Sequence, residues 1–241
     1  MTEQEWLACT DPTPMLEFLR GKASNRKLRL FACACCRRFS HMLVPEALAA
    51  LEIAEKVAEG NVTPGERKRA RDAAFHAGWV SDLSLRHRRG PAKSCVCSAL
   101  ARRPYEAAAQ AARIARHIGV LSKGVWDSTG VEVSGGLTRI VDWSSGIREQ
   151  EHLQAKLIFE VFGNPFRLSP PLPPAVLAWN DGTVRRIAEG IYAERAFDRL
   201  PILADALLDA GCDNEELIAH CWGKGPHVRG CWALDLISGM E

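Results

Sequence analysis

The residues best equipped for chemistry lie near the C-terminus, in the stretch AGCDNEELIAHCWGKGPHVRGCW at positions 210–232. Three cysteines and two histidines fall within it. Thiolate sulfur and imidazole nitrogen are the ligands that tetrahedral zinc accepts, and a Cys3His set is one of its common arrangements. The sequence therefore offers a candidate zinc site. Its four ligands would be Cys212, Cys221, His227 and Cys231, with His220 as an alternative ligand.

The spacing of these ligands is not typical of a zinc finger. Eight, five and three residues separate them, and there is no Cys-x-x-Cys knuckle. A helix beginning at Pro226 would place His227 and Cys231 one turn apart on the same face. Free cysteine, however, is among the most buried residue types and packs like a small apolar side chain. The pattern favours thiols packed in a helical core, with zinc as the competing interpretation.

A thiol enzyme is a third interpretation of the same stretch. Such an enzyme needs a nucleophilic thiol, a base and a carboxylate that orients the base. The available residues are Cys221 or Cys231, His220 or His227, and Asp205 or Asp235. No Gly-rich elbow or oxyanion hole accompanies them, and adjacent helical residues such as His220 and Cys221 point about 100 degrees apart. We therefore predict no catalytic residue, and leave open whether the protein is an enzyme.

A Cys-x-x-Cys motif also occurs, within CACC at Cys33 to Cys36. A redox pair gains reactivity at a helix N-terminus, where the helix dipole lowers the thiol pKa. Here the expected helix begins well before the motif, so packing inside the helix is favoured.

A basic segment at 61–103 carries 10 lysines and arginines against 3 acidic residues, whereas 180–241 carries 6 against 11. Such a segment can contact phosphates or an acidic partner, although a solvated helix face is the plainer explanation. No helix-turn-helix, finger or RNA-recognition pattern accompanies it, so any nucleic-acid binding would be nonspecific. The candidate contact residues are Arg67, Lys68, Arg69, Arg71, Arg86, Arg88 and Arg89.

Composition sets the class of protein. Apolar residues make up 47% of the 241 positions, enough for a core, and no run of 18 apolar residues suggests a membrane span. The N-terminus has no basic leader or long apolar region, and the nine cysteines are an odd number. We expect a cytoplasmic protein with mainly reduced thiols and no membrane partner. P-loop, dinucleotide-binding and HExxH motifs are absent.

The fold is expected to be mainly α. Helices are predicted to begin at Ser24, Pro45 and Thr63, and Thr63 with Glu66 has the pattern of a capping box. The helix from Thr63 should be long and basic, and Gly90 with Pro91 should end it. We divide the chain into a helical region at 1–122, a Gly/Ser-rich connector at 123–146 with short candidate strands in VEV and LTRIV, and a C-terminal helical module at 147–241.

The C-terminal module should contain short helical hairpins. Asp198 should cap a helix whose apolar stripe, Leu200, Leu203, Ala204, Leu207 and Leu208, has the spacing of an amphipathic helix, and Gly211 stands where a left-handed residue would end it. Asp213 with Glu216 should open the next helix. Pro226 should open the last one, from His227 to Ser238.

Two parts of the chain resemble a family of proteins that is numerous in planctomycete-type bacteria. The motifs are EWLACTDPTPMLEFLRGKASNRKLRLFACACCRR near the start, and FGNPFR, RLPILADALLDAGCDNEELIAHC and HVRGCWALDL in the C-terminal part. The resemblance covers about 1–60 and 155–241, and leaves out the basic segment. It implies a bacterial intracellular protein with two helical parts, and it supplies neither a substrate nor a catalytic residue.

The sequence as a whole predicts a non-enzymatic binding or adaptor protein whose partner is an unidentified protein, docked through the basic segment. The alternative is a zinc-binding or Cys/His-dependent enzyme that uses the C-terminal cluster. No cofactor other than zinc is suggested.

Overall fold

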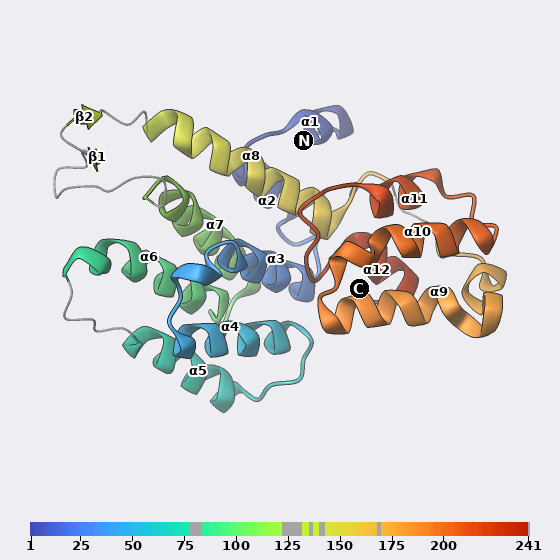
Figure 1. Ribbon diagram of the computed structural model, residues 1–241, viewed down its shortest axis with the longest axis horizontal. Coiled ribbons are helices and arrows are strands. Elements are labelled where there is room, and N and C mark those ends of the chain that lie inside the picture. The colour runs from blue at the N-terminus through green and yellow to red at the C-terminus, as the bar shows by residue number, and fades with distance from the viewer. Residues whose placement is uncertain (78–82, 122–131, 135–136, 140–142, 168–169, 241) are drawn as a thin grey trace. The chain divides into compact units, whose positions relative to one another are not determined.

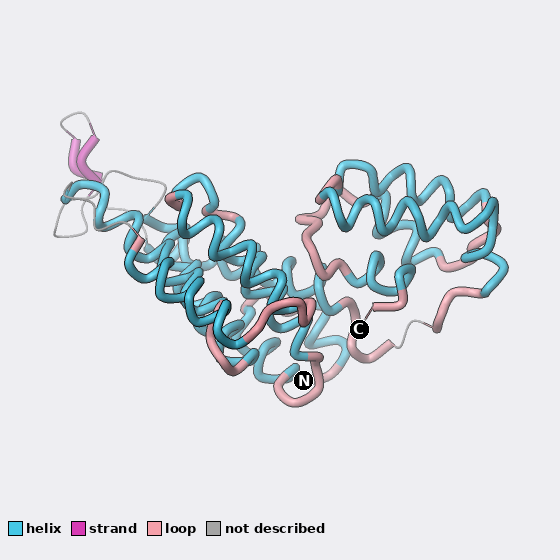
Figure 2. The backbone as a smooth tube through the Cα atoms, turned by 90° about the horizontal axis from the view of Figure 1, so that it is seen from below, coloured by secondary structure: helices cyan, strands magenta, loops and turns pink. Residues whose placement is uncertain are grey.

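A computed structural model of the chain describes the backbone of residues 1–77, 83–121, 132–134, 137–139, 143–167 and 170–240, and the side chains of 1–77, 91–119, 144–167 and 170–240. The fold is mainly α, as predicted (Figures 1 and 2). It divides into two compact units. Unit 1 comprises Ala8–Ala155 with Met1, and unit 2 comprises Thr2–Leu7 with Lys156–Glu241.

Unit 1 is a bundle of helices. Its helices are α2 (Pro12–Leu19), α3 (Asn25–Arg37), α4 (Pro45–Ala58), α5 (Pro64–His76), α6 (Leu83–Ala99) and α7 (Pro104–Leu121), with a 3-10 turn η1 (Ser40–Met42). Helix α3 packs against α4, α6 and α7. Every residue of α3 from Leu28 to Cys36 is buried, so this helix forms the centre of the unit.

The predicted helix starts are confirmed. The Ser24 hydroxyl accepts from the Lys27 N–H, and the Thr63 hydroxyl and Glu66 carboxylate form a complete capping box. Pro45 is the first residue of α4. At Ser24 and Thr63 a side-chain oxygen accepts from an N–H group that the helix leaves without a partner, and at Pro45 the proline has no N–H that needs one.

The long basic helix was predicted wrongly. Helix α5 ends at His76 and α6 begins at Leu83, while 78–82 lie outside the described residues. Gly90 and Pro91 lie inside α6 and do not end it. The C-terminal half of α6 buries Ala92, Val96 and Ala99 along one face, and this tertiary packing outweighs the poor helix propensity of the Gly-Pro pair.

The expected strands form one antiparallel pair, β1 (Glu132–Ser134) and β2 (Leu137–Arg139), with Val133 opposite Thr138. Most of the predicted connector lies outside the described residues. Helix α8 (Trp143–Phe162) begins within its last part, and the division between the two units falls inside α8, between Ala155 and Lys156.

Unit 2 contains α1 (Glu3–Ala8, of which Ala8 belongs to unit 1), the last turns of α8, α9 (Pro174–Glu194), a 3-10 turn η2 (Phe197–Arg199), α10 (Leu200–Asp209), α11 (Glu215–Trp222) and α12 (Trp232–Ser238). In the apolar stripe of α10, Leu200, Leu203, Ala204 and Leu207 are buried as predicted, whereas Leu208 is 46% exposed. Gly211 adopts φ +74°. The N–H of Cys212 bonds to Leu207 O and that of Gly211 to Leu208 O, which closes the end of α10.

Three local predictions in unit 2 need correction. Asn214, not Asp213, caps α11 by accepting from the Leu217 N–H. Asp198 lies in η2 and does not cap α10, whose flanking residue Arg199 makes no side-chain cap. Helix α12 begins at Trp232, six residues after Pro226. The segment before it is rich in glycine, and Gly230 has φ +87°, so no helix can form across His227 and Cys231.

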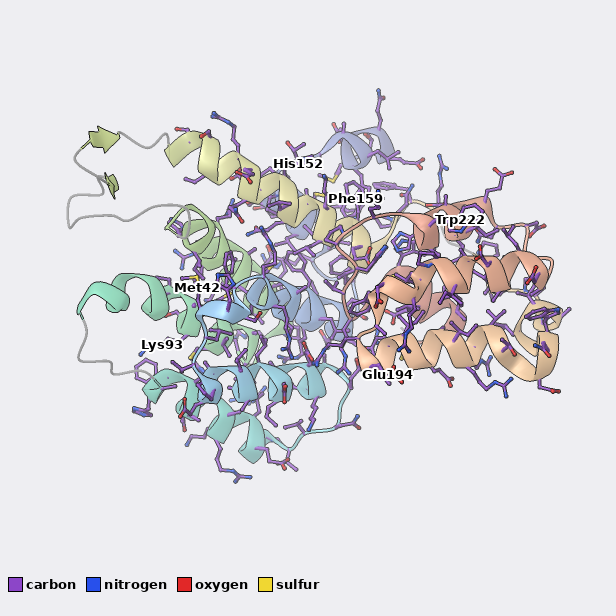
Figure 3. The ribbon with its side chains drawn as sticks, viewed as in Figure 1. Met42, Lys93, His152, Phe159, Glu194 and Trp222 are labelled. Carbon is purple, nitrogen blue, oxygen red and sulfur yellow. The ribbon has the colours of Figure 1, made fainter. Side chains whose placement is uncertain are left out.

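The N-terminal helix α1, which the sequence did not predict, belongs to unit 2. Trp6 is fully buried and its ring packs edge-on against Phe159 of α8 with 5.6 Å between centroids (Phe159 is labelled in Figure 3). Glu3 accepts a hydrogen bond from the Asn164 amide and pairs with Arg167. These contacts hold the end of α8 in place. Within the part of the chain that the structure describes, none of the helices combines the length and apolarity needed to cross a membrane.

Candidate metal centre

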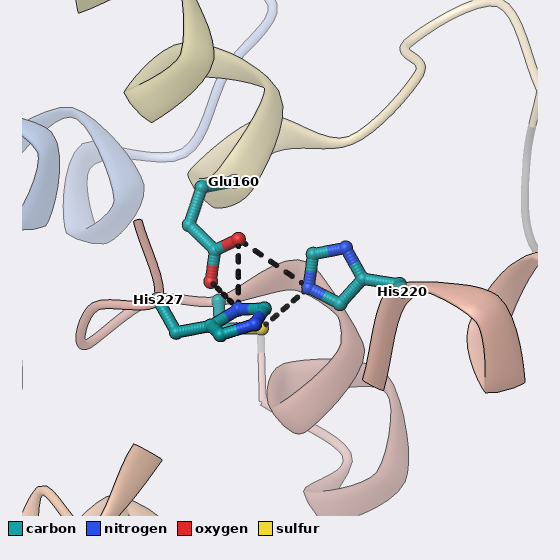
Figure 4. A group of neighbouring side chains, drawn as sticks. Glu160, His220 and His227 are labelled. Carbon is teal, nitrogen blue, oxygen red and sulfur yellow. Dashed lines mark hydrogen bonds and ion pairs between the residues drawn. The ribbon is translucent and has the colours of Figure 1, made fainter. Parts of the chain in front are cut away.

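Four side chains of unit 2 converge on one point (Figure 4). They are Glu160, His220, His227 and Cys231, and one potential ligand atom from each lies within 4.8 Å of the others. They come from three segments: Glu160 from the last turn of α8, His220 from the last turn of α11, and His227 and Cys231 from the loop at 223–231, which ends directly before α12. The group is assembled only when these segments pack together.

Local structure fixes each segment. Helix α8 ends two residues after Glu160, where Gly163 turns with φ +62° and its N–H bonds to Phe159 O. The cap at Asn214 sets the start of α11 and so the direction of His220. The Cys231 N–H donates to Val228 O, and its carbonyl accepts from the Asp235 N–H in the first turn of α12. The backbone around Cys231 is therefore bonded on both sides.

The closest contacts within the group are as short as the distances between ligands of one ion. His220 Nε2 lies 3.2 Å from Cys231 Sγ and 3.4 Å from Glu160 Oε2. His227 Nδ1 lies 3.2 Å from both oxygens of Glu160. Around a tetrahedral zinc, with ligand bonds of about 2.0 to 2.3 Å, neighbouring ligand atoms are separated by about 3.3 to 3.6 Å. These three contacts are close to that range, and every pair of ligand atoms in the group lies within 4.8 Å.

His227 has the orientation of a metal ligand. Its Nε2 lies 2.9 Å from the carbonyl oxygen of Gly223, which can only accept, so Nε2 carries a proton. The neutral ring then has its lone pair on Nδ1, facing Glu160. A histidine ligand typically donates its second N–H to a carbonyl in this way. Burial alone would lower the pKa of His227, but its hydrogen bond to Glu160 and that carboxylate's charge raise the pKa.

His220 has the opposite arrangement. The indole Nε1–H of Trp232 donates to His220 Nδ1 over 3.1 Å, so the lone pair of the neutral ring is on Nδ1 and its proton is on Nε2, next to Cys231 and Glu160. Burial lowers the pKa of His220, and the charge of Glu160 offsets this only in part. The Nε2–H of His220 therefore faces the thiol of Cys231, to which it can donate, and Nε2 lies 3.4 Å from Glu160 Oε2.

The group is shielded from solvent. Cys231 is 0% exposed and the Glu160 side chain 3%, whereas His220 retains 17%. Burial, and then the nearby charge of Glu160, raise the pKa of the Cys231 thiol well above its ordinary value. A thiol in this position is a poor nucleophile and lies beyond the reach of a substrate. The arrangement thus disfavours the thiol-enzyme interpretation, although His220 and Cys231 are in contact.

The structure brings together part of the predicted ligand set. His227, Cys231 and the alternative ligand His220 converge, whereas Cys212 and Cys221 are not in the group. Cys212 is buried beyond the end of α10, and Cys221 is fully buried in α11. Burial and the charges of Glu160 and Cys212 raise the pKa of Cys221 to about 12. These two thiols are part of the apolar core, as the packing interpretation expects.

The sequence reasoning missed Glu160, which lies 60 positions before His220. A signal was present: Glu160 stands among the residues that α8 buries, next to Val161 and two positions after Ile158. A carboxylate on the buried face of a helix needs a partner of opposite charge or a metal. The carboxylates considered for a thiol enzyme are elsewhere. Asp205 accepts from the indole of Trp222, and Asp235 is buried in α12.

The other candidate residues lie in unit 1. Lys68, Arg69 and Arg71 of α5 are exposed and Arg67 is half-buried. Arg86, Arg88 and Arg89 belong to α6, but their side chains lie outside those described. Cys33 and Cys36 are buried inside α3, and the Cys36 Sγ lies 3.0 Å from Cys95 Sγ, so the Cys-x-x-Cys motif packs within the helix bundle as expected.

Comparison with protein-family models, with curated proteins and with solved structures finds no significant match to this chain. The function of the group must therefore be inferred from its own geometry.

Proposed function

We propose that unit 2 is a zinc-binding module, with Glu160, His220, His227 and Cys231 as the four ligands. The observation that supports this most directly is the convergence of one oxygen, two nitrogens and one sulfur within 4.8 Å, from the end of α8, the end of α11 and the loop at 223–231. The orientation of His227, whose Nε2–H is bonded to Gly223, adds support.

The ligand set favours a transition metal of borderline softness. A thiolate and two imidazoles select against Mg²⁺ and Ca²⁺, which prefer oxygen ligands in larger numbers. Zinc accepts sulfur, nitrogen and carboxylate oxygen in tetrahedral geometry. Glutamate and the thiolate together carry two negative charges, which would balance the charge of a divalent ion once it is bound.

The role we assign to the metal is structural. All four coordination positions come from the protein and are largely buried, so no position is left for a substrate, whereas catalytic zinc keeps one open. The ion would join the end of α8, α11, the 223–231 loop and α12. A small helical unit with short α11 and α12 gains stability from such a cross-link.

The test is the metal content of tag-free protein, measured by elemental analysis after extensive dialysis, for the wild type and for Glu160→Gln. We expect about one zinc per chain in the wild type and a large loss in the variant. The matched control is Glu189→Gln, which removes an exposed carboxylate of α9 in the same unit.

Absence of zinc from the wild type, together with no uptake on titration with Zn²⁺, would refute the proposal. The four residues would then form a hydrogen-bonded network in the core. Equal zinc content in Glu160→Gln and Glu189→Gln would show that the ion binds elsewhere.

A second candidate function is the docking of an anionic or acidic partner to α5. The observation that favours it is the exposure of this helix: Ala74 is its one buried residue, Phe75 is 61% exposed, and Lys68, Arg69 and Arg71 are exposed as well. An exposed apolar ring on a basic helix is typical of a contact surface.

Heparin, a soluble polyanion, is a suitable probe. Its affinity should fall steeply with salt and should drop in K68Q/R69Q/R71Q. The control K156Q/R185Q/K224Q removes three exposed charges from unit 2 instead. Equal loss in both triple variants would mean that net charge, and not α5, governs binding.

A further inference from the structure

We propose that Trp232 controls metal binding at this site by holding His220 in the tautomer that opposes it. The inference rests on the proposed zinc site and names the residue that regulates it. The observation that carries it is the hydrogen bond from the Trp232 indole Nε1–H to His220 Nδ1, at 3.1 Å.

The two ring nitrogens of His220 have conflicting requirements. The nitrogen that faces the other ligands is Nε2, 3.2 Å from Cys231 Sγ. To bind a metal, Nε2 must present a lone pair, so the single proton of the neutral ring must move to Nδ1. Nδ1 would then face the Trp232 N–H with an N–H of its own. Two donors at hydrogen-bond distance repel each other, and the bond is lost.

His227 has no such conflict, because its second nitrogen faces a carbonyl oxygen, which is the usual partner of a metal-bound histidine. The two histidines are therefore unequal ligands. Glu160, His227 and Cys231 are arranged to receive an ion directly, whereas His220 can complete the site only after its bond to Trp232 breaks.

Trp232 is held where it makes this bond. Its ring lies 5.0 Å from that of His220, centroid to centroid. The indole also lies near Gly163, where an added Cβ would come within 3.2 Å of Cγ of the tryptophan. Metal binding through His220 Nε2 requires the indole to give up its bond to His220.

Two consequences follow. Zinc binds more weakly than the four ligands alone would allow, because the metal-free state keeps a hydrogen bond that the metal-bound state loses. Trp232 also changes its surroundings when zinc binds, and it is the first residue of α12. Zinc binding would thus change the contacts at the start of the C-terminal helix. The site would also exchange its ion more readily than a permanently filled structural site.

The decisive experiment compares Trp232→Phe with Trp222→Phe. Trp222 lies on α11 of the same unit and is half exposed, with its indole bonded to Asp205, outside the metal group (Figure 3). Zinc affinity is measured by competition with a chromogenic chelator. We expect Trp232→Phe to bind zinc about three- to tenfold more tightly than the wild type, the range set by one net hydrogen bond, and Trp222→Phe to be unchanged. A purely structural role of Trp232 would weaken binding on substitution, so the direction of change is diagnostic.

A second measurement follows the Trp232 indole of the wild type directly. In a ¹⁵N–¹H spectrum, the indole signal of Trp232 is identified by its absence from Trp232→Phe, and zinc should shift it away from the position of a hydrogen-bonded N–H. Zinc binding that leaves this signal in place, or that is unchanged or weaker in Trp232→Phe, would overturn the inference but not the zinc site. A wild type that binds no zinc would overturn both.

Discussion

His227 donates its Nε2–H to the carbonyl of Gly223 over 2.9 Å, and this bond leaves its Nδ1 within 3.2 Å of both carboxylate oxygens of Glu160. The ring is thus oriented by the backbone of the same loop that carries it. A ligand that is fixed before the ion arrives loses little conformational entropy on binding. The glycine-rich loop at 223–231 therefore has a chemical role, in addition to linking α11 to α12.

The structure differs from the sequence-based ligand set most clearly in its cysteines, because only Cys231 of the three belongs to the group. Cys231→Ser should reduce zinc affinity by at least about 100-fold, because it removes the thiolate ligand. Cys212→Ser and Cys221→Ala should retain wild-type affinity, because neither thiol belongs to the group. Substitution of Co²⁺ for zinc gives a direct measurement, since the sulfur-to-cobalt charge-transfer band should vanish in Cys231→Ser alone. A band that disappears in Cys212→Ser would restore the original ligand set.

Much of the fold could be predicted from local signals. Ser24 and Thr63 start helices because their side-chain oxygens accept from the first N–H groups, whereas Pro45 starts one because it has no N–H to satisfy. Gly211 ends α10 because it accepts a positive φ. The prediction that Gly90 and Pro91 end a helix was wrong because the tertiary packing of α6 outweighs the low helix propensity of these two residues. Burial of one face of α6 is not visible in the sequence around the break.

The site could be predicted only in part, for the same reason. His220, His227 and Cys231 lie within twelve residues, so their common neighbourhood follows from the chain itself. Glu160 reaches them only because the end of α8 packs within unit 2, a contact between distant positions. The expected helix across His227 and Cys231 is wrong, since both lie before α12, although the two side chains do converge in the group.

Zinc should stabilise unit 2. An ion that binds only the folded state adds about 2.7 kcal/mol to the free energy of unfolding at a free concentration of 100 times its Kd. Amide hydrogen exchange measured by mass spectrometry should therefore slow in α11 and α12 when zinc is added, and recover with a chelator. Exchange in α3 and α4 of unit 1 is the internal reference and should not change. Glu160→Gln should show no response to zinc, and a response equal to that of the wild type would place the stabilising ion outside the group.

Two glycines of unit 2 should respond in opposite ways to the same substitution. Gly163 has φ +62°, and an added Cβ would lie 3.2 Å from the Trp232 ring, so Gly163→Ala should lower the free energy of unfolding by more than about 1 kcal/mol. Gly190 lies within the helical part of α9, where an added Cβ meets no atom within 4 Å. Gly190→Ala should instead raise stability by about 0.5 to 1 kcal/mol, because alanine is the better helix former. Urea unfolding followed by circular dichroism measures both variants. Destabilisation by Gly190→Ala comparable to that of Gly163→Ala would mean that the space around α9, or the close approach of Gly163 to Trp232, differs from that described.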